Sequence, residues 1–269
     1  MGSGGADRNA RRIAALSSDF QYSYAPDFAW KTAASSIMML PGLRGAWLMS
    51  QFDSAGDCID QSGHGHTLTY TVAPTYSVQG LAPYCDFRGV ATGDCLNRLD
   101  EADFDFIGNE PYIAAGIQGC SMGGWFKVDT VPTGATGDQL IGKGAPVLDT
   151  AFHLIASTVP MVFALIASNT GIGGGGPGSA LVSTGTWYFV AGVFTPSTTL
   201  ELFVDDTRYS AVTAWATLNN SAGSFCIGGQ NAATWFLDGQ ASLCWACATA
   251  LSQATVRSLY QGQRALFGK

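Results

Sequence analysis

Short apolar runs separated by turn-forming residues fill the chain after Pro41-Gly42. In residues 200–205 apolar side chains recur at every second position, which is typical of a strand with one buried face. Residues 187–193 are apolar on both faces, as in a central strand. The pattern predicts an all-β, two-sheet antiparallel sandwich. We expect strands at 43–49, 67–72, 95–99, 121–128, 139–142, 151–156, 161–166, 186–194, 199–204, 223–227, 235–237 and 240–249.

Helical patterns occur only near the two ends of the chain. Residues 7–16 have helical apolar spacing, with Asp7 as the expected cap. At the other end, Ser252 is a good N-cap for a helix over 253–263, in which Val256, Leu259 and Tyr260 form one face. The sequence therefore predicts a short C-terminal helix beside the sandwich.

Residues 1–41 differ from the rest of the chain because aromatic side chains crowd into a few positions. Such a segment either packs back on its own domain or docks on another subunit, and we favour docking. We therefore divide the chain into a docking arm with a short helix, 1–41, and a sandwich domain, 42–269. The expected contact residues of the arm are Ile13, Leu16, Phe20, Tyr22, Tyr24, Phe28 and Trp30.

Charged residues make up only 12% of the chain, about half of the usual share of roughly 25%. The deficit is concentrated in residues 154–256. Single charged residues on exposed strands normally prevent these strands from pairing with another chain. We expect this half of the sandwich to be covered by another protein chain, in a homo-oligomer or a larger assembly. The net charge of −7 argues against a nucleic-acid partner, because phosphate binding needs a basic surface. The longest apolar stretch, 159–167, is too short for membrane insertion.

The chain has seven cysteines, an odd number, so at least one cannot be bridged within the chain. Most lie among strand-like apolar residues, and we expect buried free thiols. Cys244 and Cys247 form a CxxC pair, but redox chemistry there would need a helix N-terminus, and the flanking residues are typical of a strand. A zinc site would need a second pair of ligands, which is missing.

The order of the segments carries a resemblance. The successive motifs are LRGAW (43–47), DQSGHG (60–65), SMGGWFKV (121–128), LIGKG (140–144), WYFVAGVF (187–194), LELFVDD (200–206), FCIGG (225–229), FLDG (236–239) and ALSQATVRSLY (250–260). Over about residues 42–262 this succession resembles the laminin-G-like jelly roll of the concanavalin A-like superfamily. The resemblance implies two antiparallel sheets packed face to face, with the closing helix beside them.

Two departures from the family pattern stand out. Asp205-Asp206 occupies a hairpin turn where the family usually has Asp-Gly, and the loss of glycine requires a different turn geometry. Residues 239–244 lack the acidic pair usual on that strand, which argues against inherited calcium or carboxylate chemistry there.

Candidate catalytic groups are few. Because the superfamily includes β-glucanases, hydrolysis would need two carboxylates flanking a glycosidic bond. Glu101, Asp103 and Asp105 have the two-residue period that puts side chains on one strand face, but residues 99–108 are expected to form a loop that these carboxylates solvate and cap. His64 and His66 alternate with glycine in a turn, which indicates a solvated tip. We expect no enzyme activity.

Two kinds of ligand are compatible with the remaining residues. Asp53, Asp57 and Asp60 cluster near a turn where hard oxygen ligands suit calcium, although turn capping is the simpler alternative. A glycan would need an exposed aromatic platform. Trp215, Trp235 and Trp245 are the candidates, and each is alternatively a core or interface residue. No other cofactor is expected.

Three functions follow from these observations. The first is a structural or adhesion module of a larger assembly, with glycan binding as a compatible activity. The arm fused to a laminin-G-like domain resembles bacteriophage virion proteins of capsids or tails, which implies a virion-surface location. No basic segment followed by an apolar stretch opens the chain, so we expect no secretory signal. The alternatives are a free, extracellular lectin-like module and a glycoside hydrolase. We favour the first.

Overall fold

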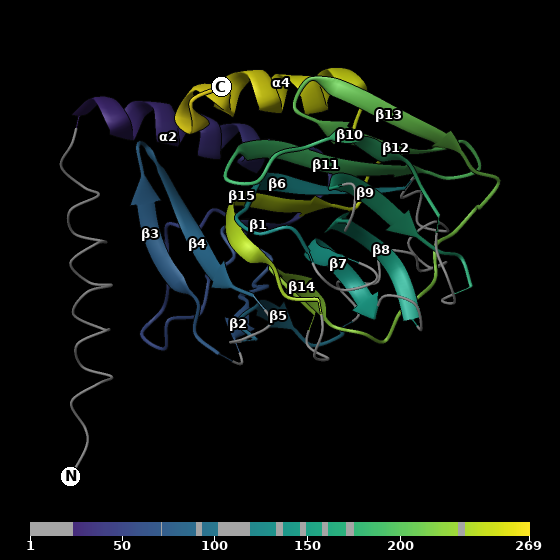
Figure 1. The fold of residues 1–269 in the computed structure, drawn as a ribbon, viewed down its shortest axis with the longest axis horizontal. Helices are drawn as coiled ribbons and strands as arrows, with labels where there is room; N and C mark the ends of the chain where they lie inside the picture. The colour runs from purple at the N-terminus through teal and green to yellow at the C-terminus, as the bar shows by residue number, and fades with distance from the viewer. Residues whose placement is uncertain are drawn as a thin grey trace, which may run out of the picture.

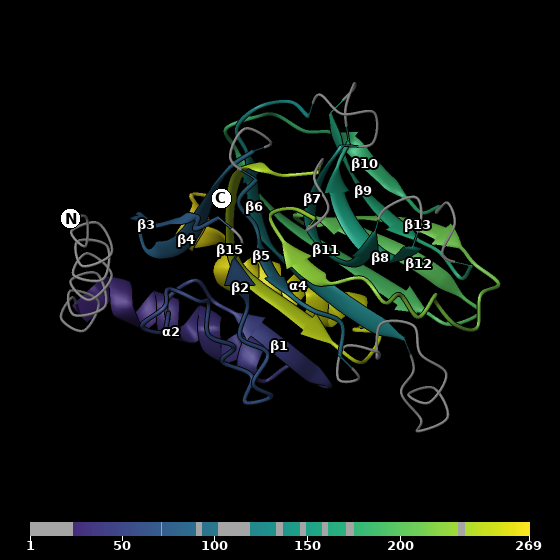
Figure 2. The same cartoon turned by 90° about the horizontal axis from the view of Figure 1, so that it is seen from below.

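The computed structural model describes residues 24–70, 72–89, 93–101, 119–132, 137–145, 149–157, 161–170, 175–230 and 235–269. Two antiparallel sheets pack face to face, and helices cover the outer face of one of them (Figure 1; Figure 2). The predicted concanavalin A-like jelly roll is confirmed.

The larger sheet has the order β13-β12-β11-β6-β15-β4-β3, and β1 pairs with β15 beside this path. Its strands are β1 (Leu43–Trp47), β3 (Thr75–Gln79), β4 (Ala82–Arg88), β6 (Cys120–Val128), β11 (Trp187–Thr195), β12 (Thr199–Val204), β13 (Thr207–Val212) and β15 (Asp238–Cys247).

The smaller sheet has the order β10-β9-β8-β7-β14-β5-β2. Its strands are β2 (Thr69–Tyr70), β5 (Leu96–Arg98), β7 (Asp138–Ala145), β8 (Asp149–Ala156), β9 (Val162–Ala167), β10 (Gly178–Leu181) and β14 (Phe225–Ile227).

The sequence pattern failed to predict four of these strands. β3, β10 and β13 are edge strands with mostly exposed or half-buried side chains, so they lack a marked apolar period. β4 contains Pro83, which normally argues against a strand. Residues 235–237, predicted as a strand, form no regular element and lead into β15.

The space between the sheets holds a core of alternating apolar side chains. Trp47, Phe126, Phe152 and Phe163 are fully buried there, and Trp47 packs against Phe225 with ring centroids 4.9 Å apart. Because every second residue of a strand faces this core, the other residues of the larger sheet point to its outer face.

That outer face is covered by α2 (Tyr24–Met38), α4 (Gln253–Gln263) and the short 3-10 helix η2 (Arg264–Phe267) (Figure 1). A second apolar core joins helices and sheet: Trp30, Ala33 and Ile37 of α2 are buried in one cluster with Trp125 and Trp245 of the sheet.

The arm predicted for residues 1–41 is thus partly an element of the domain itself. α2 was not predicted as a helix, since the aromatic residues and Pro26 hid its period; Pro26 lies in the first turn, where proline is tolerated. Trp30 packs on its own domain. The helix predicted over 7–16 lies outside the described residues.

The low charge of β11 and β12 has an explanation within the chain. Phe189, Ala191 and Phe203 point outward from these strands into the same apolar cluster as Val256 and Leu259 of α4. The chain's own C-terminal helix thus covers the outer face of these two strands. That another protein covers this half of the sandwich stays a prediction. No helix among the described residues is long and apolar enough to span a membrane.

One buried amide links three elements of the helix-covered side. The indole Nε1–H of Trp125 in β6 donates to Gln263 Oε1 at 2.8 Å, and Gln263 Nε2 donates to Ser36 Oγ in α2 at 3.3 Å. Gln263 is fully buried at the end of α4. The predicted cap is also present, since Ser252 Oγ accepts the backbone N–H of Thr255 at 3.1 Å.

The hairpin turn without glycine is held by side-chain contacts. Asp205 adopts a φ of 51°, a left-handed conformation that few residues other than glycine adopt. Its carboxylate accepts the backbone N–H of Phe189 at 3.0 Å and the Nζ of Lys269 at 2.9 Å. The turn is therefore fixed to β11 and to the last residue of the chain.

All seven cysteines are buried, as predicted, and burial raises the pKa of Cys58, Cys120 and Cys247 far above the usual thiol range. Cys244 and Cys247 lie within β15 and point to opposite sides of the sheet, Cys244 into the inner core and Cys247 toward the helices. The predicted strand context of this CxxC pair is confirmed.

The buried amide generates the first prediction. Gln263→Ala leaves the indole N–H of Trp125 buried without its acceptor, so we expect the free energy of unfolding to fall by roughly 1–3 kcal/mol. The matched control is Gln261→Ala, which removes the same group from an exposed position of the same helix and should change stability by less than about 0.5 kcal/mol. Urea unfolding measures both; equal effects of the two variants would contradict the assigned role.

Candidate functional site

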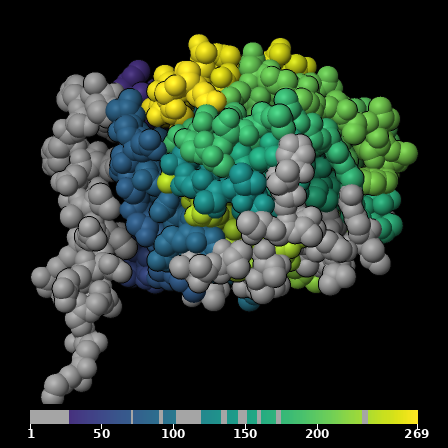
Figure 3. Space-filling view, viewed as in Figure 1, coloured from purple at the N-terminus to yellow at the C-terminus, as the bar shows by residue number. Residues whose placement is uncertain are grey.

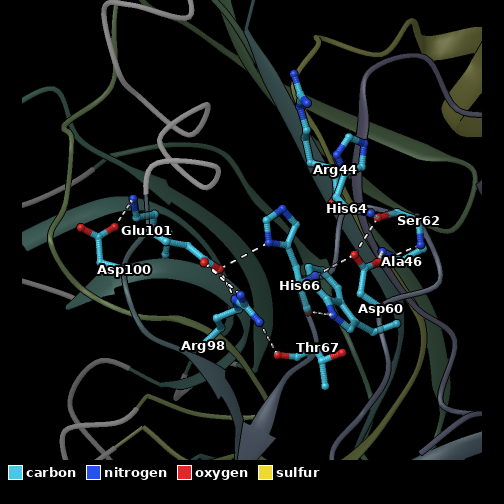
Figure 4. A network of polar contacts seen from close by, with 12 residues as sticks. Arg44, Ala46, Asp60, Ser62, His64, His66, Thr67, Arg98, Asp100 and Glu101 are labelled. Atoms are coloured by element: carbon cyan, nitrogen blue, oxygen red, sulfur yellow. Dashed lines mark hydrogen bonds and ion pairs between the residues drawn. The ribbon is translucent and has the colours of Figure 1, made fainter.

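A polar network closes one end of the sandwich, and Asp60 is at its centre (Figure 4). The Asp60 carboxylate accepts the backbone N–H groups of Ala46 at 2.9 Å, Ser62 at 2.9 Å and His66 at 3.0 Å, and the hydroxyl of Ser62 at 2.7 Å. These four bonds fix the turn of residues 60–66 onto β1. The carboxylate oxygens of Asp60 are thus occupied by the protein's own donors.

His66 and Glu101 meet across the same end (Figure 4). His66 Nδ1 lies 3.3 Å from Glu101 Oε1, and Arg98 holds the same carboxylate through Nε and through Nη2, the latter at 2.9 Å from Oε2. Hydrogen bonding and charge from Arg98, aided by His66, lower the pKa of Glu101.

The histidine pair departs from the prediction of a solvated tip. His64 is exposed, but His66 is 2% exposed because the turn folds inward and Trp47 Nε1 donates to its carbonyl at 2.8 Å. Beside it, the buried Lys143 of β7 pairs with Asp100 at 2.7 Å. No motif indicated these contacts, since their residues come from four distant segments.

Two of the three aspartates predicted for calcium, Asp53 and Asp60, accept hydrogen bonds from turn residues. Asp53 Oδ1 accepts the backbone N–H of Ala55 at 2.8 Å and of Asp57 at 3.0 Å, while Asp60 belongs to the network above. The Ala55 carbonyl accepts the Tyr70 hydroxyl at 2.6 Å. Within the described parts of the chain, no group of three acidic, histidine or cysteine side chains converges as metal ligands would. The simpler alternative, turn capping, accounts for these residues.

The tryptophans predicted as a glycan platform are mostly covered. Trp245 is fully buried beneath the helices and Trp235 is 7% exposed, so neither presents a ring face to solvent. Trp215 is half-buried and packs on the edge of the inner core. The ring of Trp245 on β15 fills the helix–sheet interface, and the sequence pattern did not reveal that this interface exists.

The predicted docking residues are distributed unevenly. Ile13, Leu16, Phe20 and Tyr22 lie outside the described residues, and Tyr24 begins α2. Phe28 is 75% exposed on the outer side of α2, whereas Trp30 is buried. Phe28 therefore presents its side chain to solvent and Trp30 does not. Asp103 and Asp105, the other candidate carboxylates, also lie outside the described residues.

A polar surface that the sequence pattern did not indicate lies on the outer face of the larger sheet. Asp86 of β4 pairs in register with Gln240 of β15, which in turn pairs with Lys127 of β6. Gln240 Nε2 donates to Asp86 Oδ1 at 2.9 Å and to Asp129 Oδ2 at 3.2 Å, and Lys127 Nζ lies 3.3 Å from Asp129 Oδ1. We name these four residues, Asp86, Lys127, Asp129 and Gln240, the polar strip.

Comparison with known proteins places this geometry in a family. Residues 113–257, more than half of the chain, match the model of the concanavalin A-like lectin/glucanases superfamily. The chain belongs to this superfamily. No curated protein matches the sequence.

Solved structures of the superfamily fold share little sequence with the chain. Trypanosoma rangeli sialidase in complex with the inhibitor DANA has a TM-score of 0.61 at 15% identity, covering 90% of this chain and 38% of the sialidase. Domain 4 of an extracellular GH43 arabinanase from Geobacillus stearothermophilus, in complex with arabinotriose, has a TM-score of 0.56 at 15% identity. The match covers 81% of this chain and 98% of the arabinanase domain.

The receptor-binding domain of botulinum neurotoxin C/D mosaic serotype has a TM-score of 0.56 at 12% identity, covering 82% of this chain and 51% of the toxin domain. The chain thus spans well under two thirds of the sialidase and of the toxin domain. At such identities the likeness concerns the fold of this superfamily member.

One buried carboxyl group has a strongly altered pKa. Asp138, at the start of β7, is 6% exposed; burial, and then the nearby carboxylate of Asp238, raise its pKa to about 7. In the unfolded chain the pKa of aspartate is about 3.9. The folded protein therefore binds this proton more tightly, and the contribution of Asp138 to stability is lost as the pH rises through 7.

Asp138→Asn tests this assignment. An amide cannot ionise, so we expect the fall in the free energy of unfolding between pH 5 and pH 8 to be smaller in the variant by roughly 2 kcal/mol. Asp206→Asn, at a side chain that is 54% exposed, should keep the wild-type pH dependence. Urea unfolding at the two pH values gives both quantities, and an unchanged pH dependence in Asp138→Asn would refute the raised pKa.

Proposed function

We propose that this superfamily member is a non-enzymatic carbohydrate-binding and adhesion module. The observation that carries the proposal is the state of Glu101. Its carboxylate is fixed by Arg98 and His66, and its pKa is lowered, so it stays ionised at neutral pH. A glycosidase acid needs the opposite, a raised pKa and a proton to donate.

Glu201 is held in a similar way. Arg208 of β13 bonds to the Glu201 carboxylate through both Nε, at 2.7 Å, and Nη2. Both glutamates in the described residues therefore hold arginine side chains in place. Together with a fold shared with an arabinanase domain crystallised with arabinotriose and with a toxin receptor-binding domain, this favours binding over hydrolysis.

A glycan array combined with a hydrolysis assay tests the proposal. We expect the full chain to bind a subset of the array and to release no reducing ends from the glycans that it binds. Glu101→Gln should leave the bound set unchanged, since Glu101 is assigned a structural role. Binding to no glycan would refute carbohydrate recognition. If the wild-type chain released reducing ends and Glu101→Gln abolished this release, the result would instead favour the hydrolase.

We also propose that the module is carried by a larger assembly, with a bacteriophage virion as the architecture that its sequence resembles. The support is the aromatic segment preceding the domain, the exposed Phe28 of α2 and the low charge of the chain. In this proposal the contacts to other subunits come from residues 1–23 and Phe28.

Two truncations separate docking from folding. Removal of residues 1–23 leaves α2 in place. We therefore expect the truncated chain to be a folded monomer, whereas the full chain forms an oligomer. Removal of residues 1–40 also deletes Trp30, Ala33 and Ile37 from the helix–sheet core and should lower the thermal midpoint markedly. Light scattering and thermal denaturation measure these results; a full-length chain that is already monomeric would contradict the assembly role.

A further inference from the structure

The polar strip lies where the helix layer ends. Outward-facing residues nearer the middle of the larger sheet, such as Trp125 and Phe189, are buried in the helix–sheet core. Two residues beyond Trp125 in β6 the outward residue is Lys127, which pairs with Gln240 of β15. On its other side Lys127 pairs with Trp187 of β11, which belongs to the helix–sheet core. The polar strip therefore borders the helix-covered part of this face.

Gln240 is the residue of the strip whose side chain has an acceptor without a hydrogen-bond donor. The residue is 7% exposed, and both of its hydrogen bonds run from Nε2 to carboxylates. Among the described residues no donor reaches its buried carbonyl Oε1. Turning the amide over would place Oε1 against two carboxylates, so the orientation is fixed by charge. A buried acceptor without a donor is unfavourable, and a hydroxyl from a ligand would supply the missing donor.

The neighbours of Gln240 suit a hydroxyl-bearing ligand better than a cation. Asp129 is 37% exposed at its side chain and Asp86 is half-buried, so both can accept from ligand hydroxyls. Lys127 beside Asp129 supplies a donor, and its positive charge opposes a metal ion at this carboxylate. Burial, and then the charge of Asp129, raise the pKa of Asp86 against the lowering effect of Gln240.

The charge around the strip selects among such ligands. The next outward row contains Arg88, which pairs with Asp94, and Asp238, which accepts the hydroxyl of Thr130. The strip and this row together carry four carboxylates and two cations. An acidic sugar would meet a net negative surface, whereas a neutral one would meet alternating acceptors and donors on adjacent strands about 4.8 Å apart.

We infer that the polar strip is a binding site for a neutral, polyhydroxylated ligand, namely an uncharged oligosaccharide. This inference rests on the proposed carbohydrate-binding function and gives it a location and a ligand class. Asp86, Asp129 and Gln240 Oε1 accept hydrogen bonds from ligand hydroxyls and Lys127 donates one, without a stacked tryptophan.

The experiment compares variants of the full chain on a glycan panel divided into neutral and sialylated members. Asp129→Asn removes one charge at constant size, and Gln240→Leu removes the amide. The matched control is Asp206→Asn, the same chemical change at the β12–β13 turn. We expect wild-type binding to neutral members, at least tenfold weaker binding by both strip variants, and control binding within twofold of wild type.

The outcomes separate the site from the function. If the wild type binds and Asp129→Asn, with an unchanged thermal midpoint, binds equally well, the strip is not the site although the protein binds carbohydrate. Binding confined to sialylated members would overturn the ligand class. A wild-type chain that binds no member would refute the proposed function and this inference together. Asp129→Asn decides the matter on its own if Gln240→Leu fails to fold.

Discussion

The fold depends on covering the outer face of the larger sheet. That face carries Trp125, Trp245 and Phe189, each fully buried, and a sheet that left such rings in water would lose several kcal/mol of apolar burial. α2 and α4 bury these rings, and Gln263 satisfies the one polar atom of Trp125 that the helices would otherwise seal off. The helices are therefore part of the domain, which has three layers.

The same cover divides the sheet into two chemically different parts. Under the helices, the outward positions are aromatic or aliphatic; beyond them, Asp86, Lys127 and Gln240 lie on the same face. The polar network of His66, Arg98 and Glu101 closes a separate end of the sandwich, where it holds a turn in place.

Much of the architecture could be predicted from the sequence because strands and helices each have a characteristic spacing of apolar residues. The strand at 199–204 alternates, and Ser252 marks the start of the last helix at the observed residue. α2 was missed although Trp30, Ala33 and Ile37 have helical spacing, since aromatic density upstream suggested an interface. The turn caps at Asp53 and Asp60 followed from local chemistry.

The sites were harder to predict because they are assembled from distant positions. His66 meets Glu101 across 35 residues, and Gln240 meets Asp86 across 154. No spacing rule links such pairs before the strand order is known. The burial of Trp245 was likewise hidden, because the sequence alone did not reveal that helices from both ends of the domain share one face of the sheet.

Hydrogen exchange followed by mass spectrometry on the full chain tests the central claim, that α2 and α4 are integral layers of the domain. If they are, the amides of α2 from Trp30 onward should be protected to the same extent as those of β6 and β15, and should exchange through the same global opening. Rapid exchange throughout α2, with β6 and β15 still protected, would show that the helix is an appendage and would contradict this account.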